Sequence, residues 1–201
     1  MDVQVVRYDA DGWGTGELWF DGGRLVNHEL PHPGAGRLPP SSSSVSSPGA
    51  RGSHASGQDR AEPAPKLGGA PERLAERLQA YFRGVAVEFT GVSLGLDWCT
   101  EFQRAVAEAL RGVPRGETVT YGELAALAGH PNAQRAAGTF CAHNRFPILV
   151  PCHRVVGSAG SLGGFSARDG ISMKRRMLEM EGAEIGPRKI RNGRKVRVAV
   201  A

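Results

Sequence analysis

The segment from residue 31 to residue 70 most constrains how this chain can fold, because it separates two parts that can each form ordered structure. It contains runs such as Pro39-Pro40-Ser41-Ser42-Ser43-Ser44 and almost no large apolar side chains. Such a segment cannot bury enough surface to offset the conformational entropy that ordering would cost. We therefore predict a disordered insertion without direct chemistry at residues 31–70.

The residues before the insertion have the pattern of antiparallel strands. Val3, Val5 and Arg7 occupy alternate positions, and residues 17–20 and 24–26 flank the sequence Asp21-Gly22-Gly23. An Asp-Gly-Gly sequence between two apolar runs is typical of a β-hairpin turn. We expect strands over residues 1–30, with a turn at residues 21–23.

The residues after the insertion are mainly typical of helices. Leu74, Leu78 and Phe82 recur at helical spacing, and Gly84 is a stop signal for that helix. Residues 85–89, with the sequence Val-Ala-Val-Glu-Phe, predict a short strand.

Two capping boxes mark the beginnings of further helices. Thr100 is followed three residues later by Gln103, and Thr120 is followed in the same way by Glu123. In this motif the threonine side chain accepts the backbone N–H of the third residue, whose own side chain binds back. The second of these helices ends at Gly129. The apolar face of the first helix consists of Phe102, Val106 and Leu110.

A turn at His130-Pro131-Asn132 precedes the next predicted helix. Asn132 is its expected N-cap, and the helix extends from Ala133 to His143. Two short helices joined by a Gly/Pro turn are a candidate helix-turn-helix motif, and an ordinary helical hairpin explains the pattern equally well. A last helix is predicted from Ile171 to Glu181.

The composition limits the compartment and the partners that we expect. The formal net charge of +5 and the isoelectric point near 9.5 are compatible with nucleic acid as a partner. We find no run of 18 apolar residues and no signal-peptide pattern, so we expect no membrane span and a cytoplasmic protein, or a nuclear one in a eukaryote. The three cysteines form no CxxC pair or Cys/His cluster, which indicates a reducing compartment and no metal site.

One cysteine differs from the other two in its neighbours. Cys152 lies in the sequence Pro151-Cys152-His153-Arg154-Val155, whereas Cys99 and Cys141 have no such neighbours. A free thiol with a pKa near about 8.5 is only a few per cent ionised at neutral pH, and positive neighbours and a fixed base raise that fraction. We therefore predict that Cys152 is a nucleophile with a lowered pKa and that Cys99 and Cys141 are buried as small apolar side chains.

Residues 94–185 as a whole resemble the C-terminal domain of the O6-alkylguanine-DNA alkyltransferases, the direct-reversal DNA repair proteins. The matching segments are 118–129, Arg135–Gly138, Asn144, 147–156 and 163–166. The resemblance implies an α+β fold, with a small N-terminal αβ domain containing a short sheet at 1–93. A mostly helical DNA-binding and active-site domain with a helix-turn-helix would follow at 94–185. Residues 186–201 form a basic tail that is either a phosphate-binding extension or simply a solvated run.

The resemblance also implies a reaction. The family transfers a methyl or other alkyl group from O6-alkylguanine, and from O4-alkylthymine, to its cysteine, which here would be Cys152. A histidine takes the thiol proton through a water molecule, and a glutamate on the last helix orients that histidine. These residues would be His153 and Glu181. We choose Glu181 over Glu179 because the family's acid precedes a glycine, as Glu181 precedes Gly182.

Two further residues would complete the reacting group. Tyr121 would offer a proton to the ring nitrogen N3 of the guanine, and Asn144 would tie the helix-turn-helix to the cysteine loop. No cofactor is implied. The protein would be consumed in a single turnover, because nothing in the sequence supplies a second nucleophile that could remove the thioether.

The partner that the resemblance implies is double-stranded DNA carrying O6-alkylguanine. A monomer would bind it through the minor groove, with the damaged base flipped out of the stack. Arg135 would enter the stack in place of the flipped nucleotide, while Ala136 and Gly138 would let the helix lie close to the DNA beside Tyr121. The substrate pocket would be lined by Val155, Ser166 and Pro147.

Three other functions are compatible with parts of the sequence. Alkyltransferase-like proteins bind DNA damage without catalysis, but they usually carry tryptophan where Cys152 stands. A cysteine hydrolase would need an oxyanion hole and a base that is distant in sequence from the nucleophile. A DNA-binding regulator would account for the two short helices but not for the Cys-His pair. Cys152 therefore favours the transferase.

Overall fold

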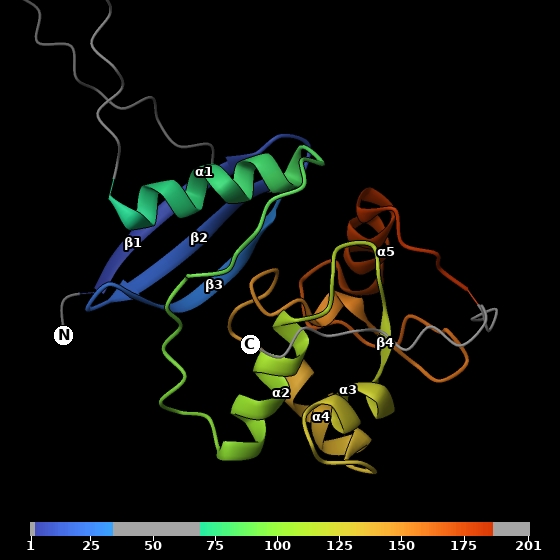
Figure 1. Ribbon diagram of the computed structural model, residues 1–201. Helices are drawn as coiled ribbons and strands as arrows, with labels where there is room; N and C mark the ends of the chain where they lie inside the picture. The colour runs from blue at the N-terminus through green and yellow to red at the C-terminus, as the bar shows by residue number, and fades with distance from the viewer. Residues whose placement is uncertain (1–2, 34–68, 187–201) are drawn as a thin grey trace, which may run out of the picture.

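Three antiparallel strands begin the computed structural model, which describes residues 3–33 and 69–186. They are β1 (Val3–Ala10), β2 (Gly14–Asp21) and β3 (Arg24–His32), in the spatial order β1-β2-β3. Helix α1 (Ala70–Phe82) lies along one face of this sheet (Figure 1). Gly22 and Gly23, with φ of 55° and 77°, form the turn between β2 and β3. The hairpin turn predicted at residues 21–23 is therefore confirmed.

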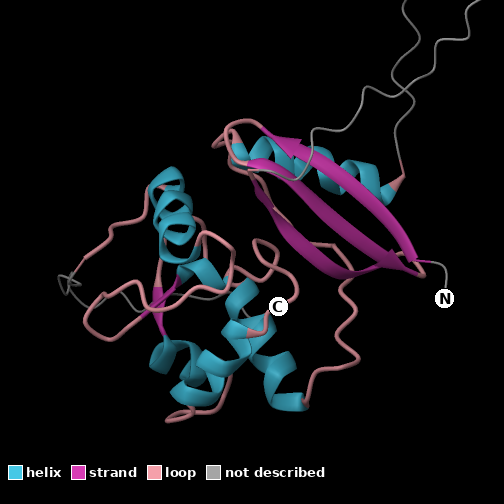
Figure 2. Cartoon of the chain, turned by 180° about the vertical axis from the view of Figure 1, so that it is seen from behind, coloured by secondary structure: helices cyan, strands magenta, loops and turns pink. Residues whose placement is uncertain are grey.

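Short helices dominate the described residues after α1. Two two-residue strands, β4 (Val119–Thr120) and β5 (Val155–Val156), pair in parallel among them. Figure 2 shows these helices gathered on one side of the molecule, with the sheet and α1 on the other. The α+β class predicted from the sequence is confirmed. The helices are α2 (Glu101–Arg111), α3 (Tyr121–Leu127), α4 (Gln134–Ala142), the 3-10 turn η1 (Cys152–Arg154) and α5 (Gly170–Glu181).

Both predicted capping boxes are present. The Thr100 hydroxyl accepts the backbone N–H of Gln103 at 3.3 Å, and the Gln103 side chain accepts the N–H of Thr100 at 2.9 Å. The matching distances at Thr120 and Glu123 are 3.1 and 2.7 Å. Each box satisfies two backbone donors that the first turn of a helix leaves without partners. These bonds fix where α2 and α3 begin.

The strand predicted at residues 85–89 is wrong. These residues have no regular secondary structure, and Val85 is exposed. The guanidinium of Arg115 donates to the carbonyl oxygens of Gly84 and Val85 at 3.0 and 3.2 Å. Arg115 thus takes one backbone acceptor of this segment, the carbonyl of Val85, and residues 85–89 form no strand.

Two predicted boundaries also differ from the structure. Asn132 is not the N-cap of α4, because its φ of 71° places it in the preceding turn and Ala133 occupies the cap. Strand β3 continues through His32, so the predicted insertion does not begin at residue 31. Residues 34–68 and the basic tail from 187 to 201 lie outside the described residues. Within the described residues, no helix is long and apolar enough to cross a membrane.

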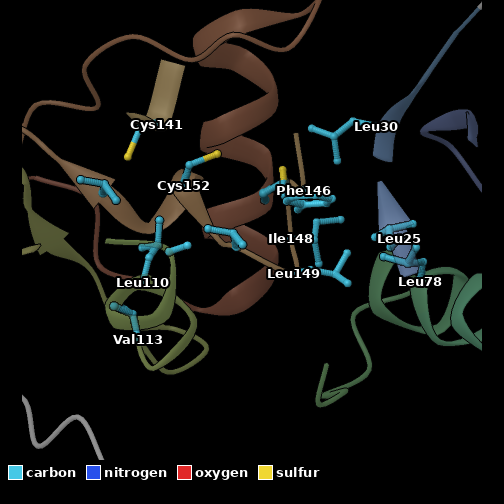
Figure 3. Close-up of a cluster of buried hydrophobic side chains, with 14 of the residues drawn as sticks. Leu25, Leu30, Leu78, Leu110, Val113, Cys141, Phe146, Ile148, Leu149 and Cys152 are labelled. Atoms are coloured by element: carbon cyan, nitrogen blue, oxygen red, sulfur yellow. The ribbon is translucent and has the colours of Figure 1, made fainter. Parts of the chain in front are cut away.

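One hydrophobic core connects the sheet to the helices. Leu25 of β3 and Leu78 of α1 lie beside Ile148 and Leu149, and the same cluster continues to Cys152 and Leu110 (Figure 3). Backbone bonds reinforce this contact, since the N–H of His28 donates to the carbonyl of Arg145 at 2.9 Å. The segment that carries Cys152 is therefore packed directly against strand β3.

We expect the Leu78→Ala substitution to lower the free energy of unfolding by about 2–5 kcal/mol, because Leu78 is fully buried between α1 and the sheet. The Leu127→Ala variant is the control, since Leu127 is 40% exposed on α3. Its effect should stay within about 0.5 kcal/mol. Urea denaturation of both variants measures the difference, and equal losses would contradict this placement of the core.

Candidate active site

Cys152 begins the single turn η1, directly after Pro151. Its Sγ accepts a hydrogen bond from Asn144 Nδ2 at 3.2 Å. The same amide nitrogen donates to the Val150 carbonyl at 2.8 Å, and Asn144 Oδ1 accepts the N–H of Phe146 at 3.0 Å. Asn144 lies just after α4, so its side chain ties the end of that helix to the segment that carries the cysteine.

His153 and Glu181 form a buried pair beside the cysteine. His153 Nε2 lies 3.1 Å from Glu181 Oε1, and neither side chain is exposed. An ionised carboxylate only accepts, so Nε2 carries the proton and Nδ1 of the neutral ring has a free lone pair. Nδ1 is buried and has no hydrogen-bond partner within the described residues. No hydrogen bond joins Cys152 Sγ directly to the imidazole.

Further donors complete the environment of Glu181. The Tyr81 hydroxyl donates to Oε1 at 2.7 Å. Arg154 donates through Nη2 to Oε1 at 2.7 Å and through Nε to Oε2 at 2.9 Å. Burial opposes ionisation of this carboxyl, but the hydrogen bonds from His153 and Arg154 and the positive charge of Arg154 outweigh it and hold the pKa of Glu181 well below its usual range.

The pKa of the Cys152 thiol differs from the one that the sequence predicted. Burial raises the pKa of Cys152, and the hydrogen bond from Asn144 and the charge of Lys174 offset this only in part. Arg154 does not lower the pKa, because its guanidinium is bound to Glu181 and to the Val113 carbonyl. Burial also lowers the pKa of His153, which favours the neutral ring. The predicted low thiol pKa is therefore wrong for the free protein.

Lys174 is a fully buried lysine that sequence reasoning missed. It lies on α5, and its Nζ donates to the carbonyl oxygens of Val155, at 2.6 Å, and Leu162. Burial lowers the pKa of Lys174, while nearby Cys152 opposes that effect. The lysine thus holds the Gly-rich loop after β5 against α5. Its only signal in the sequence is a charge next to the apolar positions of that helix.

A cavity of about 210 Å³ opens at the cysteine. Cys152, Asn144, Pro147 and Ser166 line it together, and all four were predicted as site or pocket residues. Residues 28–32 of strand β3 also line the cavity, and sequence reasoning did not include them. Val155 is not among the lining residues, because it is fully buried and its carbonyl is held by Lys174. The cavity is large enough to admit a small planar ligand to the thiol.

Tyr121 lies at the first turn of α3, between α4 and the Gly-rich loop. A Cβ atom added at Gly138 would lie 3.7 Å from its ring, and one added at Gly163 would lie 3.5 Å from its hydroxyl. Burial raises the pKa of Tyr121. A side chain at position 138 would thus make only an ordinary van der Waals contact with the tyrosine ring, so glycine is not required there for α4 to pack against Tyr121.

Two of the four residues predicted to contact DNA lie on the surface of α4, while Gly138 is half-buried on that helix and Tyr121 lies on α3. Arg135 and Ala136 are exposed, and neither lines the cavity. Helices α3 and α4 pack against each other at the end of the molecule remote from the three-stranded sheet (Figures 1 and 2). Among the described residues, no group of three or more His, Cys, Asp or Glu side chains is arranged to hold a metal ion.

Comparison with known proteins agrees with this arrangement. Residues 101–183 match the family model described as 6-O-methylguanine DNA methyltransferase, DNA binding domain. A methylated-DNA–protein-cysteine methyltransferase from Methanopyrus kandleri is 46% identical over 111 residues, which are 55% of this chain and 79% of that relative. The crystal structure of Mycobacterium tuberculosis OGT in complex with DNA has a TM-score of 0.63 and 34% identity, covering 89% of this chain and 92% of that one. The chain therefore belongs to the O6-methylguanine-DNA methyltransferase family.

Other curated relatives are matched over a smaller share of their length. The protein of the same name from Methanothermobacter thermautotrophicus is 39% identical over 114 residues, 57% of this chain and 62% of that relative. The Mycobacterium tuberculosis protein is 46% identical over 113 residues, 56% of this chain and 66% of that relative. In these alignments the chain thus spans somewhat less than two thirds of the relatives.

We expect Glu181→Gln to lower the free energy of unfolding at neutral pH by about 3 kcal/mol, because it leaves the mostly buried guanidinium of Arg154, 12% exposed, without its counter-charge. Glu179 lies on the same helix and is exposed, so Glu179→Gln should change stability by less than about 0.5 kcal/mol.

The pH dependence of that difference has a definite sign. The pKa of Glu181 is lowered in the folded state, so its contribution is present above the usual carboxyl pKa of about 4.3 and is lost as the pH falls below it. Urea denaturation of wild type and Glu181→Gln should therefore give curves that converge in acid. A difference that stays constant with pH would show that Glu181 is not ionised in the fold.

Proposed function

We propose that this chain repairs DNA by direct reversal, moving a methyl or other alkyl group from O6 of guanine, and from O4 of thymine, to Sγ of Cys152. The observation that carries the proposal is the position of this thiol. It lies at the wall of a cavity of about 210 Å³, bound by Asn144 and next to the His153–Glu181 pair. The names of the relatives, and the DNA complex of the structural neighbour, support the same reaction.

The reaction requires a base for the thiol proton. His153 Nδ1 has the free lone pair, but no direct hydrogen bond joins it to Sγ, so the proton passes through a water molecule. The charge that forms on the imidazole is stabilised by the ionised Glu181 at 3.1 Å. Because burial keeps the resting thiol protonated, the thiolate forms when the substrate is in place. Tyr81 and Arg154 act as positioning residues that hold the carboxylate.

The group transfer is a displacement at carbon. The thiolate attacks the alkyl carbon, the S–C bond forms as the C–O6 bond breaks, and the bonding electron pair passes into the guanine ring. Tyr121 donates a proton to ring nitrogen N3, so the base leaves as neutral guanine. The proton held by His153 returns to Tyr121 through solvent. The product on Cys152 is a thioether, which water does not hydrolyse, so one molecule accepts one alkyl group.

Helices α3 and α4 are proposed to act as a helix-turn-helix that binds duplex DNA through the minor groove. Exposed Arg135 would stack in the gap left by the flipped nucleotide, which offsets part of the cost of unstacking. Ala136 and Gly138 would permit close approach of α4 to the DNA. We assign these functions to residues 94–185, with 1–93 as an N-terminal αβ domain. The protein would act as a monomer without a cofactor, in the cytoplasm or nucleus with the DNA.

The alternative function is that of an alkyltransferase-like protein, which binds alkylated DNA without accepting the alkyl group. Such a protein needs the base pocket but no acceptor. This alternative is disfavoured by the presence of Cys152, whose Sγ is hydrogen-bonded by Asn144 and which is next to the base His153 and its partner Glu181.

Incubation with DNA containing O6-methylguanine, followed by digestion and mass spectrometry, should show one methyl group on Cys152. The Cys152→Ala variant should accept none and should still bind the DNA, because the proposed DNA contacts lie on α3 and α4. The Cys141→Ala variant is the matched control and should be methylated on Cys152 normally. Methyl transfer by Cys152→Ala, or a methyl group on another residue of the wild type, would show that the acceptor is wrongly assigned.

The Arg135→Ala substitution should slow repair of duplex DNA by about tenfold or more, because loss of the stacking replacement raises the cost of base flipping. The same variant should react with free O6-benzylguanine at the wild-type rate, since the free base needs no extrusion. Single-turnover rates on the two substrates measure this split. Equal slowing on both substrates would remove Arg135 from the proposed role.

A further inference from the structure

His28 of strand β3 forms hydrogen bonds to the segment that carries the cysteine. Its ring is buried and joins two groups, with Nδ1 2.7 Å from the Pro147 carbonyl oxygen and Nε2 2.7 Å from the Tyr8 hydroxyl. A carbonyl oxygen only accepts, so Nδ1 carries the proton and Nε2 accepts from Tyr8. Burial lowers the pKa of His28 to about 4, which keeps the neutral ring that both bonds require. The backbone N–H of His28 adds a third bond, to the Arg145 carbonyl.

The segment that His28 holds is strained. Ile148 has a φ of 73°, a left-handed conformation that is a genuine outlier for a β-branched residue. Such a conformation persists only where the surrounding contacts over-determine it. The Pro147 carbonyl belongs to the peptide unit that ends at the nitrogen of Ile148, so its direction is coupled to this φ. The bond from His28 Nδ1 therefore bears directly on the strained residue.

Packing holds the other side of this turn. The N–H of Val150 donates to the Phe146 carbonyl at 2.8 Å and closes the turn around Ile148. The Ile148 side chain lies beside Leu149 and faces the Leu25 and Leu78 side of the core (Figure 3). The hydrogen bond and the apolar contact thus fix the turn from the same strand.

The turn around Ile148 positions groups of the Cys152 site. Pro147, Cys152 and His28 all line the cavity. The Val150 carbonyl at the end of the turn binds the same Asn144 nitrogen that donates to Cys152 Sγ. A shift of the turn would therefore move both the cavity wall and the donor that contacts the nucleophile.

We propose that His28 is a positioning residue of the Cys152 site, and that its bond to the Pro147 carbonyl holds the strained turn at Ile148 in the geometry that the reaction needs. The three-stranded sheet is then part of the reacting machinery and not only a neighbouring structure. The inference rests on the proposed alkyl transfer, and its first test measures the rate of that reaction. A second test does not need that activity.

Two nearly isosteric substitutions separate the two bonds of His28. In His28→Asn, the amide nitrogen occupies the place of Nδ1 and can still donate to Pro147, while the Tyr8 bond is lost. In His28→Gln, the longer side chain reaches the place of Nε2 and keeps Tyr8, while the Pro147 bond is lost. Tyr8→Phe is a third variant that removes the Tyr8 bond and leaves the histidine in place.

The first measurement is the single-turnover rate of Cys152 alkylation by free O6-benzylguanine, analysed as a maximal rate and a half-saturating concentration. We expect His28→Gln to lower the maximal rate by about tenfold or more, because displaced reacting groups lose their alignment. His28→Asn and Tyr8→Phe should stay within about threefold of wild type, even where urea denaturation shows lost stability. Slowing of all three variants in proportion to their lost stability would overturn the proposal.

The second measurement is the rate at which a small aromatic disulfide reagent modifies Cys152 in a Cys99→Ala, Cys141→Ala background. A loosened turn exposes the buried thiol, so His28→Gln should react several times faster than His28→Asn or the parent. If the parent accepts no alkyl group from any substrate, the proposed function fails, and this reagent still decides the role of His28. Equal reaction rates in the parent and both His28 variants would exclude the positioning role.

Discussion

The buried Glu181 carboxylate is the interaction on which the rest of the structure depends. Its two oxygens accept four hydrogen bonds, from the Tyr81 hydroxyl, the His153 ring and two nitrogens of Arg154. A buried charge is costly unless it is paired and fully hydrogen-bonded, and these donors come from α1 and η1 while the acid itself lies on α5. The carboxylate can be satisfied only when the three elements are docked together. The same docking of α1, η1 and α5 therefore stabilises the fold and sets the geometry of the site.

The same burial decides how the thiol can react. A desolvated thiolate is a strong nucleophile toward carbon, but burial also makes it harder to form, and the pKa of Cys152 is raised accordingly. Adjacency in the sequence does not activate it, because Arg154 is bound to Glu181 and Val113. Activation must come from groups that accept or stabilise charge as the proton moves, which are Asn144, Lys174 and the imidazole. In the proposed single-turnover reaction, a thiol that stays protonated until its substrate is bound is not consumed by other electrophiles.

Local signals made much of this structure predictable, and long-range contacts account for the rest. The Gly-Gly turn and the capping boxes depend on residues within three or four positions, and the Cys152–His153 pair is contiguous. The bond between Tyr81 and Glu181 joins residues 100 positions apart, and that between His28 and Pro147 joins residues 119 apart. Nothing in the local pattern indicates such pairs. At residues 85–89, where the predicted strand is wrong, the distant side chain of Arg115 binds the Val85 carbonyl, and this contact too has no local signal.

The distribution of buried polar residues shows what the interior of this chain is arranged to do. Five polar or charged residues are buried within the described ranges, and only Thr15 lies away from the cysteine. The other four are in contact with the segments that form the Cys152 site: His28, His153, Lys174 and Glu181. Well-packed apolar side chains would stabilise a fold at least as well as such groups do. Their concentration around one thiol is therefore explained by chemistry at Cys152, where each of them holds a backbone carbonyl, a proton or a charge in place.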